Sequence, residues 1–538
     1  MHVMAVATPR AGVVILVTWV LVTLAAGSLL VAMSLHDSLT SVADDSSNYL
    51  VMALELSPWK EADPGIRSVW PLQYFPPGFP LILALSGAAH SLLAAHALVL
   101  VMGLCSLPLC FRFGRLAGLG RGAAHATAML YLCTPGFLLG LQGILSEALY
   151  LLLVLCALMA AETSGRPSRG WLLAGVLAAL AFATRSVGAV LLLAMAAALS
   201  TQAFRRQMHL RHFVQALCLL AVPSLLTICI VTLSRPSGAG DYSSVWAALH
   251  ARLAQADPLQ TGHYLAAQLA ALVDAWNAFL VLYWLGDMAT GRVVSLLLLL
   301  VAVVGCLCRL LQNRADGWFV AGSLALLLIW PFPGQMMRFL FPLVPLLLVQ
   351  AAWVLQHLAS PRMSVIPLFA FALVAACVLP SNAFLWGRVG MAYEAGLVPV
   401  YEWLRRPALA EAQRDLLVQN AMLTDMHRLR ELPPPAVVAT HEPSYVALLA
   451  GIPSLPIEQP LTLASVQEAL RQGATHVYLG AIHPRKSRQE IDGMAIAPEA
   501  APFLSPVWCS YTVKGDERAG CLYVLRAPLL DPTPRLPS

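Results

Sequence analysis

The sequence predicts a polytopic α-helical membrane protein with a small α/β domain at its C-terminal end. Of the 538 residues, 59% are hydrophobic and 11% are charged, and the mean hydropathy is +0.73. A soluble domain carries about 25% charged residues, so this chain has too few charges to cover a water-facing surface of its size. Long apolar runs continue to residue 380, and hydropathy falls beyond it. We therefore expect a membrane domain, 1–380, followed by a polar domain, 381–538.

The membrane domain contains about eleven apolar runs that are long enough, or nearly so, to cross a bilayer, which takes about 20 residues per helix. The first run follows Arg10 and is too long for the core of a cleaved signal peptide, so we expect it to be retained as a span. The runs are 11–33, 94–111, 122–141, 146–161, 171–184, 187–204, 213–233, 293–311, 317–333, 339–357 and 363–380.

The basic residues of the short connections predict the orientation. Alternate connections are rich in arginine, and these basic turns define the cytoplasmic side by the positive-inside rule. Their residues are Arg10, Arg112, Arg115, Arg121, Arg166, Arg169, Arg205, Arg206, Arg211, Arg309, Arg314 and Arg362. The N-terminus is then cytoplasmic, and an odd number of spans places the C-terminal domain on the outer side. Three segments face outward, namely 34–93, 234–291 and 381–538.

The polar domain reads as a small α/β or α+β module. Residues 388–430 form a charged, amphipathic pattern typical of helix, and the proline run at 433–435 ends it. Beyond it, strands are expected at 436–440 and 475–480, and helices at SYVALLAG and SVQEALRQG. PVWCSYTV and CLYVLRAPL are expected to pair as the two strands of a hairpin. Cys509 and Cys521 lie in these strands and either pair as a disulfide in an oxidising compartment or remain buried thiols.

The first outer loop, 34–93, begins with two adjacent acids in SVADDSSNYLVMALEL, residues 41–56. The run after Asp45 is apolar and places Tyr49, Ala53 and Leu56 on one helical face, which predicts a helix lying along the membrane surface. An acid at a helix N-terminus is favoured by the helix dipole and by capping. Capping therefore explains one acid, Asp44 or Asp45, but not both.

The order of these motifs resembles the GT-C superfamily, whose members are glycosyltransferases that use polyprenyl-phosphate sugars. The first motif is D-S-x-x-Y-x-x-x-A from Asp45, followed by Y-F-P-P-G-F-P at 74–80. Further on come L-S-E-A-L-Y at 145–150, F-A-T-R-S-V-G at 182–188 and R-F-L-F-P-L-V-P at 338–345. Within the superfamily, the chain is similar to the bacterial relatives of protein O-mannosyltransferases and of the lipid A aminoarabinose transferase. The resemblance covers residues 1–380 and the presence of an outer C-terminal domain.

The resemblance implies an inverting enzyme of the bacterial inner membrane, with its C-terminal domain in the periplasm. The sugar would move from a polyprenyl phosphate to a periplasmic glycan, lipid or protein, and no nucleic acid takes part. A carboxylate must accept the acceptor proton, and cations must stabilise the leaving phosphate. The resemblance assigns the base to Asp45, with Asp44 as the alternative because the register of two adjacent acids is ambiguous.

Six further residues are substrate-binding candidates. Tyr49 shares the Asp45 motif, and Glu147 would orient the acceptor or bind a metal, unless it only caps a helix end. Arg185 and Arg338 lie away from the basic cytoplasmic turns, which favours binding of phosphate. Ion pairing with Asp45 or Glu147 for assembly explains them as well. Arg67 and Tyr74 complete the set; Phe75 stands where the related transferases have lysine. No cofactor is predicted with certainty, a divalent metal stays open, and the sequence identifies neither the sugar nor the acceptor.

Two other classes of function fit a chain of this composition. A transporter or lipid flippase would place ionisable residues near the middle of the membrane and would break its helices there. In this chain the notable charges lie at predicted outer helix ends instead. A non-catalytic protein of envelope assembly would tolerate the loss of Asp45, and only an activity measurement separates it from an enzyme.

Overall fold

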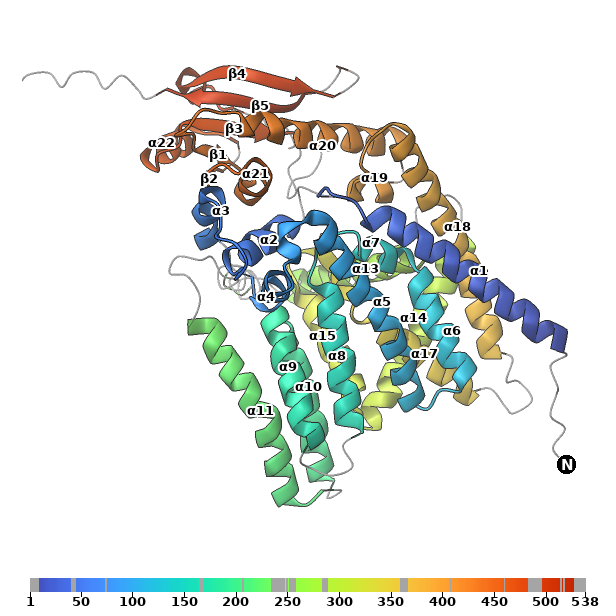
Figure 1. Ribbon diagram of the computed structural model, residues 1–538. Helices are drawn as coiled ribbons and strands as arrows, with labels where there is room; N and C mark the ends of the chain where they lie inside the picture. The colour runs from blue at the N-terminus through green and yellow to red at the C-terminus, as the bar shows by residue number, and fades with distance from the viewer. Residues whose placement is uncertain are drawn as a thin grey trace, which may run out of the picture.

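The computed structural model describes residues 9–39, 45–72, 75–163, 169–205, 208–233, 258–282, 289–358, 366–406, 408–458, 460–481, 496–512 and 518–526, together with a few isolated positions. Helices make up the larger part, and a sheet lies at one end of them (Figure 1). The short helices α2, α3 and α4 lie between the long helices and the sheet-containing domain.

Each of the eleven predicted spans contains a helix. The helices of this part are α1 (Pro9–Ser34), α2 (Ser46–Glu55), α3 (Pro64–Val69), α4 (Gly78–Leu85), α5 (Leu92–Leu116), α6 (Arg121–Cys133), α7 (Pro135–Gly140), α8 (Glu147–Glu162), α9 (Arg169–Thr184), α10 (Gly188–Phe204), α11 (Leu210–Leu233), α13 (Pro258–Val281), α14 (Ala289–Leu311), α15 (Ala315–Ile329), α16 (Met336–Leu340), α17 (Val344–Leu358) and α18 (Ile366–Glu394).

Within the described residues, four helices are long and apolar enough to cross a membrane, and a fifth span results if the pair α16–α17, bent by 64°, is counted as one. One of the four was not among the predicted spans. It is Leu259–Val281 of α13, which the sequence placed in an outer segment, 234–291. Its mean hydropathy of 1.4 is the lowest of the four, because polar residues such as His263 and Asn277 interrupt the apolar run. The segment 234–291 therefore contains a helix with the length and hydropathy of a span that the sequence did not predict.

The C-terminal part contains a five-stranded mixed sheet with strand order β2-β1-β3-β5-β4. The strands β1 (Val438–Thr440), β2 (Ser454–Pro456) and β3 (His476–Gly480) run parallel, and β4 (Leu504–Tyr511) and β5 (Arg518–Leu525) form an antiparallel hairpin. The helices are α19 (Tyr401–Arg405), α20 (Leu409–Arg430), α21 (Pro443–Ala450) and α22 (Leu463–Arg471). All strands except β2 were predicted. The single helix expected over 388–430 is instead the end of α18 followed by α19 and α20.

The hairpin carries a disulfide between Cys509 and Cys521, which are directly opposite each other on β4 and β5. The structure thus decides between the two alternatives that the sequence left open. Three other buried polar groups lie beside this pair. Tyr478 and Ser510 both donate hydrogen bonds to Asp425 of α20, at 2.9 and 2.6 Å. These bonds join α20 to the sheet.

The C-terminal part packs directly on the short helices of the first loop. Val51 of α2, Ile66 and Val69 of α3 and Ala447 of α21 form a small buried core. Beside it, a Cβ on Gly65 would lie 2.9 Å from the backbone carbon of Gly451, so the two backbones touch. This contact holds α2 and α3 between the sheet-containing part and the long helices.

Candidate active site

Asp45 directly precedes α2 and occupies its N-cap position, but its carboxylate makes no capping hydrogen bond. Its backbone carbonyl accepts the first helical bond, from the amide of Tyr49 at 3.0 Å. The hydroxyl of Ser46 accepts a hydrogen bond from the amide of Ile144 at 3.0 Å, which ties this end of α2 to the segment before α8. The backbone at Asp45 is therefore held in place, while its carboxylate is available for interactions outside the helix.

That carboxylate binds Arg338 of α16. The Nη1 of Arg338 donates to Oδ2 of Asp45 at 2.5 Å, and its Nε donates to Oε1 of Glu147. The two acids lie far apart in the sequence, on α2 and α8, and one guanidinium joins them. Arg338 lies close to the sharp bend between α16 and α17, so the break in this helix presents its side chain to the two acids.

Glu147 is the first residue of α8 and is 2% exposed. An acid in the first turn is stabilised by the unpaired backbone amides there. A second guanidinium, from Arg185, approaches the same Oε1 atom at 2.6 Å. Oε2 of Glu147 has no hydrogen-bond partner in the described structure. Glu147 thus holds two arginines through one oxygen.

Arg185 lies in the short connection between α9 and α10. It donates to the hydroxyl of Ser146 at 3.1 Å, and its guanidinium lies 5.3 Å from the centre of the Phe339 ring. Ser146 is also hydrogen-bonded to the Tyr49 hydroxyl at 3.0 Å. Burial raises the pKa of Tyr49, so its hydroxyl stays protonated and acts as a hydrogen-bonding group rather than as a base.

We call these four charged residues, Asp45, Glu147, Arg185 and Arg338, the ion-pair cluster. Two positive and two negative groups balance, and the side chains of Asp45 and Arg338 are the accessible ones, at 28% and 22% exposure. Nη2 of Arg338 makes no hydrogen bond within the described structure, so it can donate to an incoming anion. The cluster therefore combines a reachable carboxylate with unused guanidinium donors.

Five of the predicted site residues meet here: Asp45, Tyr49, Glu147, Arg185 and Arg338. Arg67 does not; it lies on α3 and pairs with Glu61 at 3.3 Å. Asp44 and Tyr74 lie outside the described residues. Ser146 was not predicted, although it stands beside Glu147 in the motif at 145–150.

A metal site does not fit the described side chains. Nowhere in the described part of the chain do three histidine, cysteine or acidic side chains gather in a way that could hold a metal ion. In the cluster itself, the carboxylates of Asp45 and Glu147 already bind arginines. We therefore derive no chemical step through a metal.

Comparison with known proteins finds similarity to solved structures only. No family model and no curated protein matches the chain. ArnT from Cupriavidus metallidurans bound to undecaprenyl phosphate is 13% identical, with a TM-score of 0.53 over 95% of this chain and 99% of that chain. Its apo form has the same TM-score and identity, over 96% and 100% of the two chains.

A third structure is the oligosaccharyltransferase of Archaeoglobus fulgidus tethered to an acceptor peptide. It is 12% identical, with a TM-score of 0.45 over 95% of this chain and 75% of that chain. The two ArnT structures carry the conclusion, because their likeness extends over nearly the whole of both chains. The chain therefore shares the fold of ArnT over nearly its whole length.

Proposed function

We propose that this protein is an inverting glycosyltransferase that moves a sugar from a polyprenyl phosphate to a hydroxyl or amine of an acceptor. The observation that carries the proposal is the ion-pair cluster, in which the accessible Asp45 carboxylate pairs with Arg338, and Glu147 joins Arg338 to a second guanidinium, that of Arg185. Such a reaction needs one carboxylate and a cationic site for phosphate. The shared fold supports it, since one structure with this fold holds undecaprenyl phosphate.

Arg338 and Arg185 receive the donor phosphate. Arg338 offers its unused Nη2 first, and the phosphate then competes with Asp45 for Nη1, since both are anions that accept from the same donor. Glu147 remains buried and keeps both guanidinium groups in position. Binding of the donor thereby releases the carboxylate of Asp45 from its ion pair.

Asp45 then acts as the general base. The acceptor oxygen or nitrogen attacks the anomeric carbon while its proton passes to the carboxylate. The bond between that carbon and the phosphate oxygen breaks, and the electron pair leaves on the phosphate, where the arginines stabilise the growing charge. A single displacement inverts the anomeric configuration.

The remaining expectations belong to the same proposal. The protein spans the bacterial inner membrane about eleven times, with a cytoplasmic N-terminus and the cluster and C-terminal domain on the periplasmic side. The membrane domain is 1–380 and the periplasmic domain 381–538, although α18 (Ile366–Glu394) continues across that boundary. Asp44 is the alternative base, and Arg67 and Tyr74 contribute to binding further along the first loop. The acceptor is an envelope glycan, lipid or protein.

The test is transfer of a radiolabelled sugar from a polyprenyl phosphate to the envelope fraction of cells that lack this protein. We expect Asp45→Asn to reduce turnover by about 10² to 10⁴-fold, the range of general-base catalysis. Asp44→Asn separates the two acids, and Asp37→Asn, an exposed acid of the same loop, is the matched control. Binding of undecaprenyl phosphate, measured separately, should survive in all three. Full turnover of folded Asp45→Asn would refute the assignment of the base, and a wild-type protein that consumes no donor would refute the enzyme itself.

A further inference from the structure

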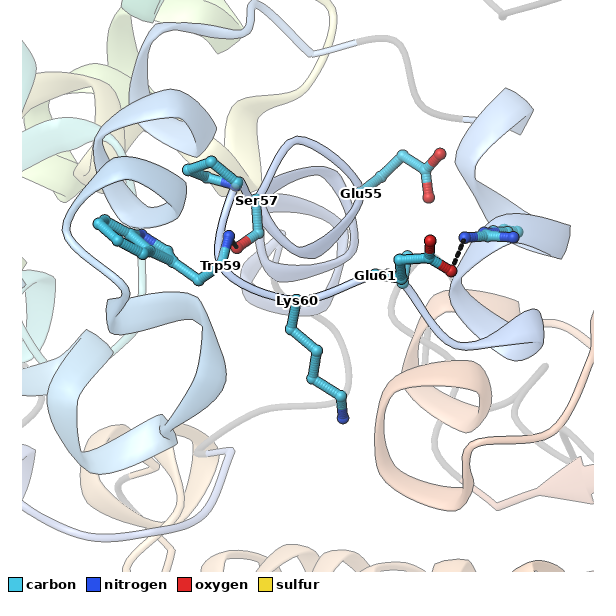
Figure 2. Close-up of a pocket in the computed structure, with 8 residues that line it drawn as sticks. Glu55, Ser57, Trp59, Lys60 and Glu61 are labelled. Carbon is cyan, nitrogen blue, oxygen red and sulfur yellow. Dashed lines mark hydrogen bonds and ion pairs between the residues drawn. The ribbon is translucent and has the colours of Figure 1, made fainter.

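A cavity of about 400 Å³ lies at the other end of α2, away from Asp45. We call it the α2–α3 cavity. It is lined by Glu55, Ser57, Pro58, Trp59, Lys60, Glu61, Ala62 and Arg67 (Figure 2). In this view the indole of Trp59 lies on one side and the carboxylates of Glu55 and Glu61 lie on the other. The proposed reaction uses none of these groups at the reacting atoms.

Trp59 is exposed and yet fixed. Its side chain is 65% accessible, while its indole Nε1 donates to the backbone carbonyls of Ala84 and Leu85, at 2.9 and 3.2 Å. These carbonyls lie at the end of α4, so the helix holds the ring in one orientation. A large aromatic face held in this way can stack on an apolar surface of a ligand at low entropic cost.

The opposite wall is also built onto fixed elements. Arg67 belongs to α3, and the neighbouring Ser68 accepts a hydrogen bond from the amide of Ser454 at 3.0 Å. Together with the contact between Gly65 and Gly451, this bond holds α3 against the C-terminal part. The cavity is therefore formed between the end of α2 and a helix that the C-terminal part holds in place.

Some charged side chains of the cavity form ion pairs and one does not. Arg67 pairs with Glu61 at 3.3 Å, and Lys60 approaches Asp63 at 4.0 Å. Glu55 lines the cavity and forms no ion pair in the described structure, and its buried Oε2 has no hydrogen-bond partner there. An unpaired carboxylate accepts hydrogen bonds and repels anions. The site is thus suited to a ligand that carries hydroxyl donors.

We propose that the α2–α3 cavity binds a saccharide part of the acceptor, remote from the reacting group; this assignment rests on the proposed transferase function. The fixed face of Trp59 stacks on the sugar ring, and Glu55 accepts from its hydroxyls. An anionic lipid headgroup fits less well, because both cations already have acidic neighbours and Glu55 is unpaired. The ten residues of α2 span about 15 Å, so the acceptor extends over several sugar units from Asp45.

The experiment measures steady-state transfer by the full-length protein in nanodiscs, with the envelope fraction titrated as acceptor. We expect Trp59→Ala and Glu55→Gln each to raise the acceptor KM by about tenfold, the loss expected for one good contact. The kcat, the donor KM and the affinity for undecaprenyl phosphate should stay unchanged, because a remote contact made equally in ground and transition states affects KM alone. Trp386→Ala, a 39% exposed tryptophan of α18, is the matched control.

A second variant tests the cavity by blocking it. Lys60→Cys introduces a thiol at a side chain that is 68% exposed, and its reaction with a bulky maleimide should raise the acceptor KM further, while wild type treated in the same way should not change. Normal wild-type transfer with unchanged acceptor KM in the variants overturns the cavity assignment alone. A change that appears only in phosphatidylglycerol nanodiscs makes the cavity a lipid site and also overturns it. A wild type without transfer overturns the proposed function and this assignment together.

Discussion

Two arginine–carboxylate clusters of this protein use the same chemical groups in different ways. In the first, Arg309 of α14 binds Asp316 of α15, and both side chains are almost fully buried, at 4% and 0% exposure. Both oxygens of Asp316 are used: Arg309 donates to each, and Gln350 adds a bond to Oδ2 at 3.1 Å. This pair joins three helices and leaves its carboxylate no room for a further partner.

The ion-pair cluster around Glu147 is built differently. Asp45 and Glu147 each bind arginine through one oxygen, and Arg338 keeps an unused Nη2. Asp45 and Arg338 are also partly exposed. A buried charge pair becomes favourable only when its remaining hydrogen-bonding groups are satisfied. The saturated pair at Asp316 therefore suits stability, and the unsaturated cluster suits binding of a ligand that completes it.

The largest effect that this comparison predicts is the loss of transfer in Arg338→Gln. We expect activity to fall by about 100-fold or more, because one fixed donor to a developing anion contributes that much. The melting temperature should change little, since Glu147 keeps Arg185 and Asp45 reaches solvent. Transfer and thermal unfolding are measured on the same preparation.

Arg471→Gln is the control for that variant. Arg471 pairs with Glu468 on the surface of α22, at 71% exposure, so its loss should leave both quantities unchanged. If Arg338→Gln instead unfolds the protein while the folded fraction keeps full specific activity, then the cluster serves assembly, and the two clusters do not differ in function.

Arg309→Gln should show the opposite result. It leaves the Asp316 carboxylate buried without its cation, which costs about 3–5 kcal/mol. We expect a clearly lower midpoint of thermal unfolding in detergent, with unchanged kcat and donor KM per folded molecule. The double variant Arg309→Gln with Asp316→Asn should recover part of the loss, since it removes the unpaired charge. A normal midpoint together with lost transfer would contradict the structural role of this pair.

The sequence predicts the individual residues and helices of the site far better than the contacts between them. The helix that follows Asp45 and the two arginines outside the basic turns were found from local patterns, because apolar periodicity and the positions of charges are local properties. Contact between Asp45 and Arg338 joins residues 293 positions apart, and no local pattern encodes it. Their juxtaposition was expected through the resemblance to the GT-C family, and also under the alternative in which Arg338 pairs with Asp45 or Glu147 for assembly.

The features that the sequence did not predict, namely β2, α13 and the role of Ser146, share one physical origin. The strand β2 has only three residues and pairs with β1 through tertiary contacts, so it has no pattern of its own. In α13 the polar residues that lowered the hydropathy include Asn277 and Gln268, both buried against other helices. Ser146 had no signal beyond its place next to Glu147. Tertiary packing decided each of these cases.

Asp425 offers a third case beside the two arginine–carboxylate clusters. It is a buried acid whose hydrogen bonds come from two hydroxyl groups rather than from an arginine. Burial raises its pKa, and the bonds from Ser510 and Tyr478 oppose that effect. A raised pKa in the folded state means that the folded protein binds this proton more tightly than the unfolded chain does. The contribution of Asp425 to stability is therefore complete below about pH 3.9, the value of a free aspartate, and is lost as the pH rises through the higher folded pKa.

Asp425→Asn, which stays neutral, should consequently gain stability relative to wild type as the pH rises from acid to neutral. The gain is the smallest of these effects, because one group titrates and its two hydrogen bonds remain available to the amide oxygen. Hydrogen exchange of β5 peptides, compared between the two proteins at each pH, measures the local difference in stability. A difference in stability that does not depend on pH would contradict a raised pKa of Asp425 in the folded protein.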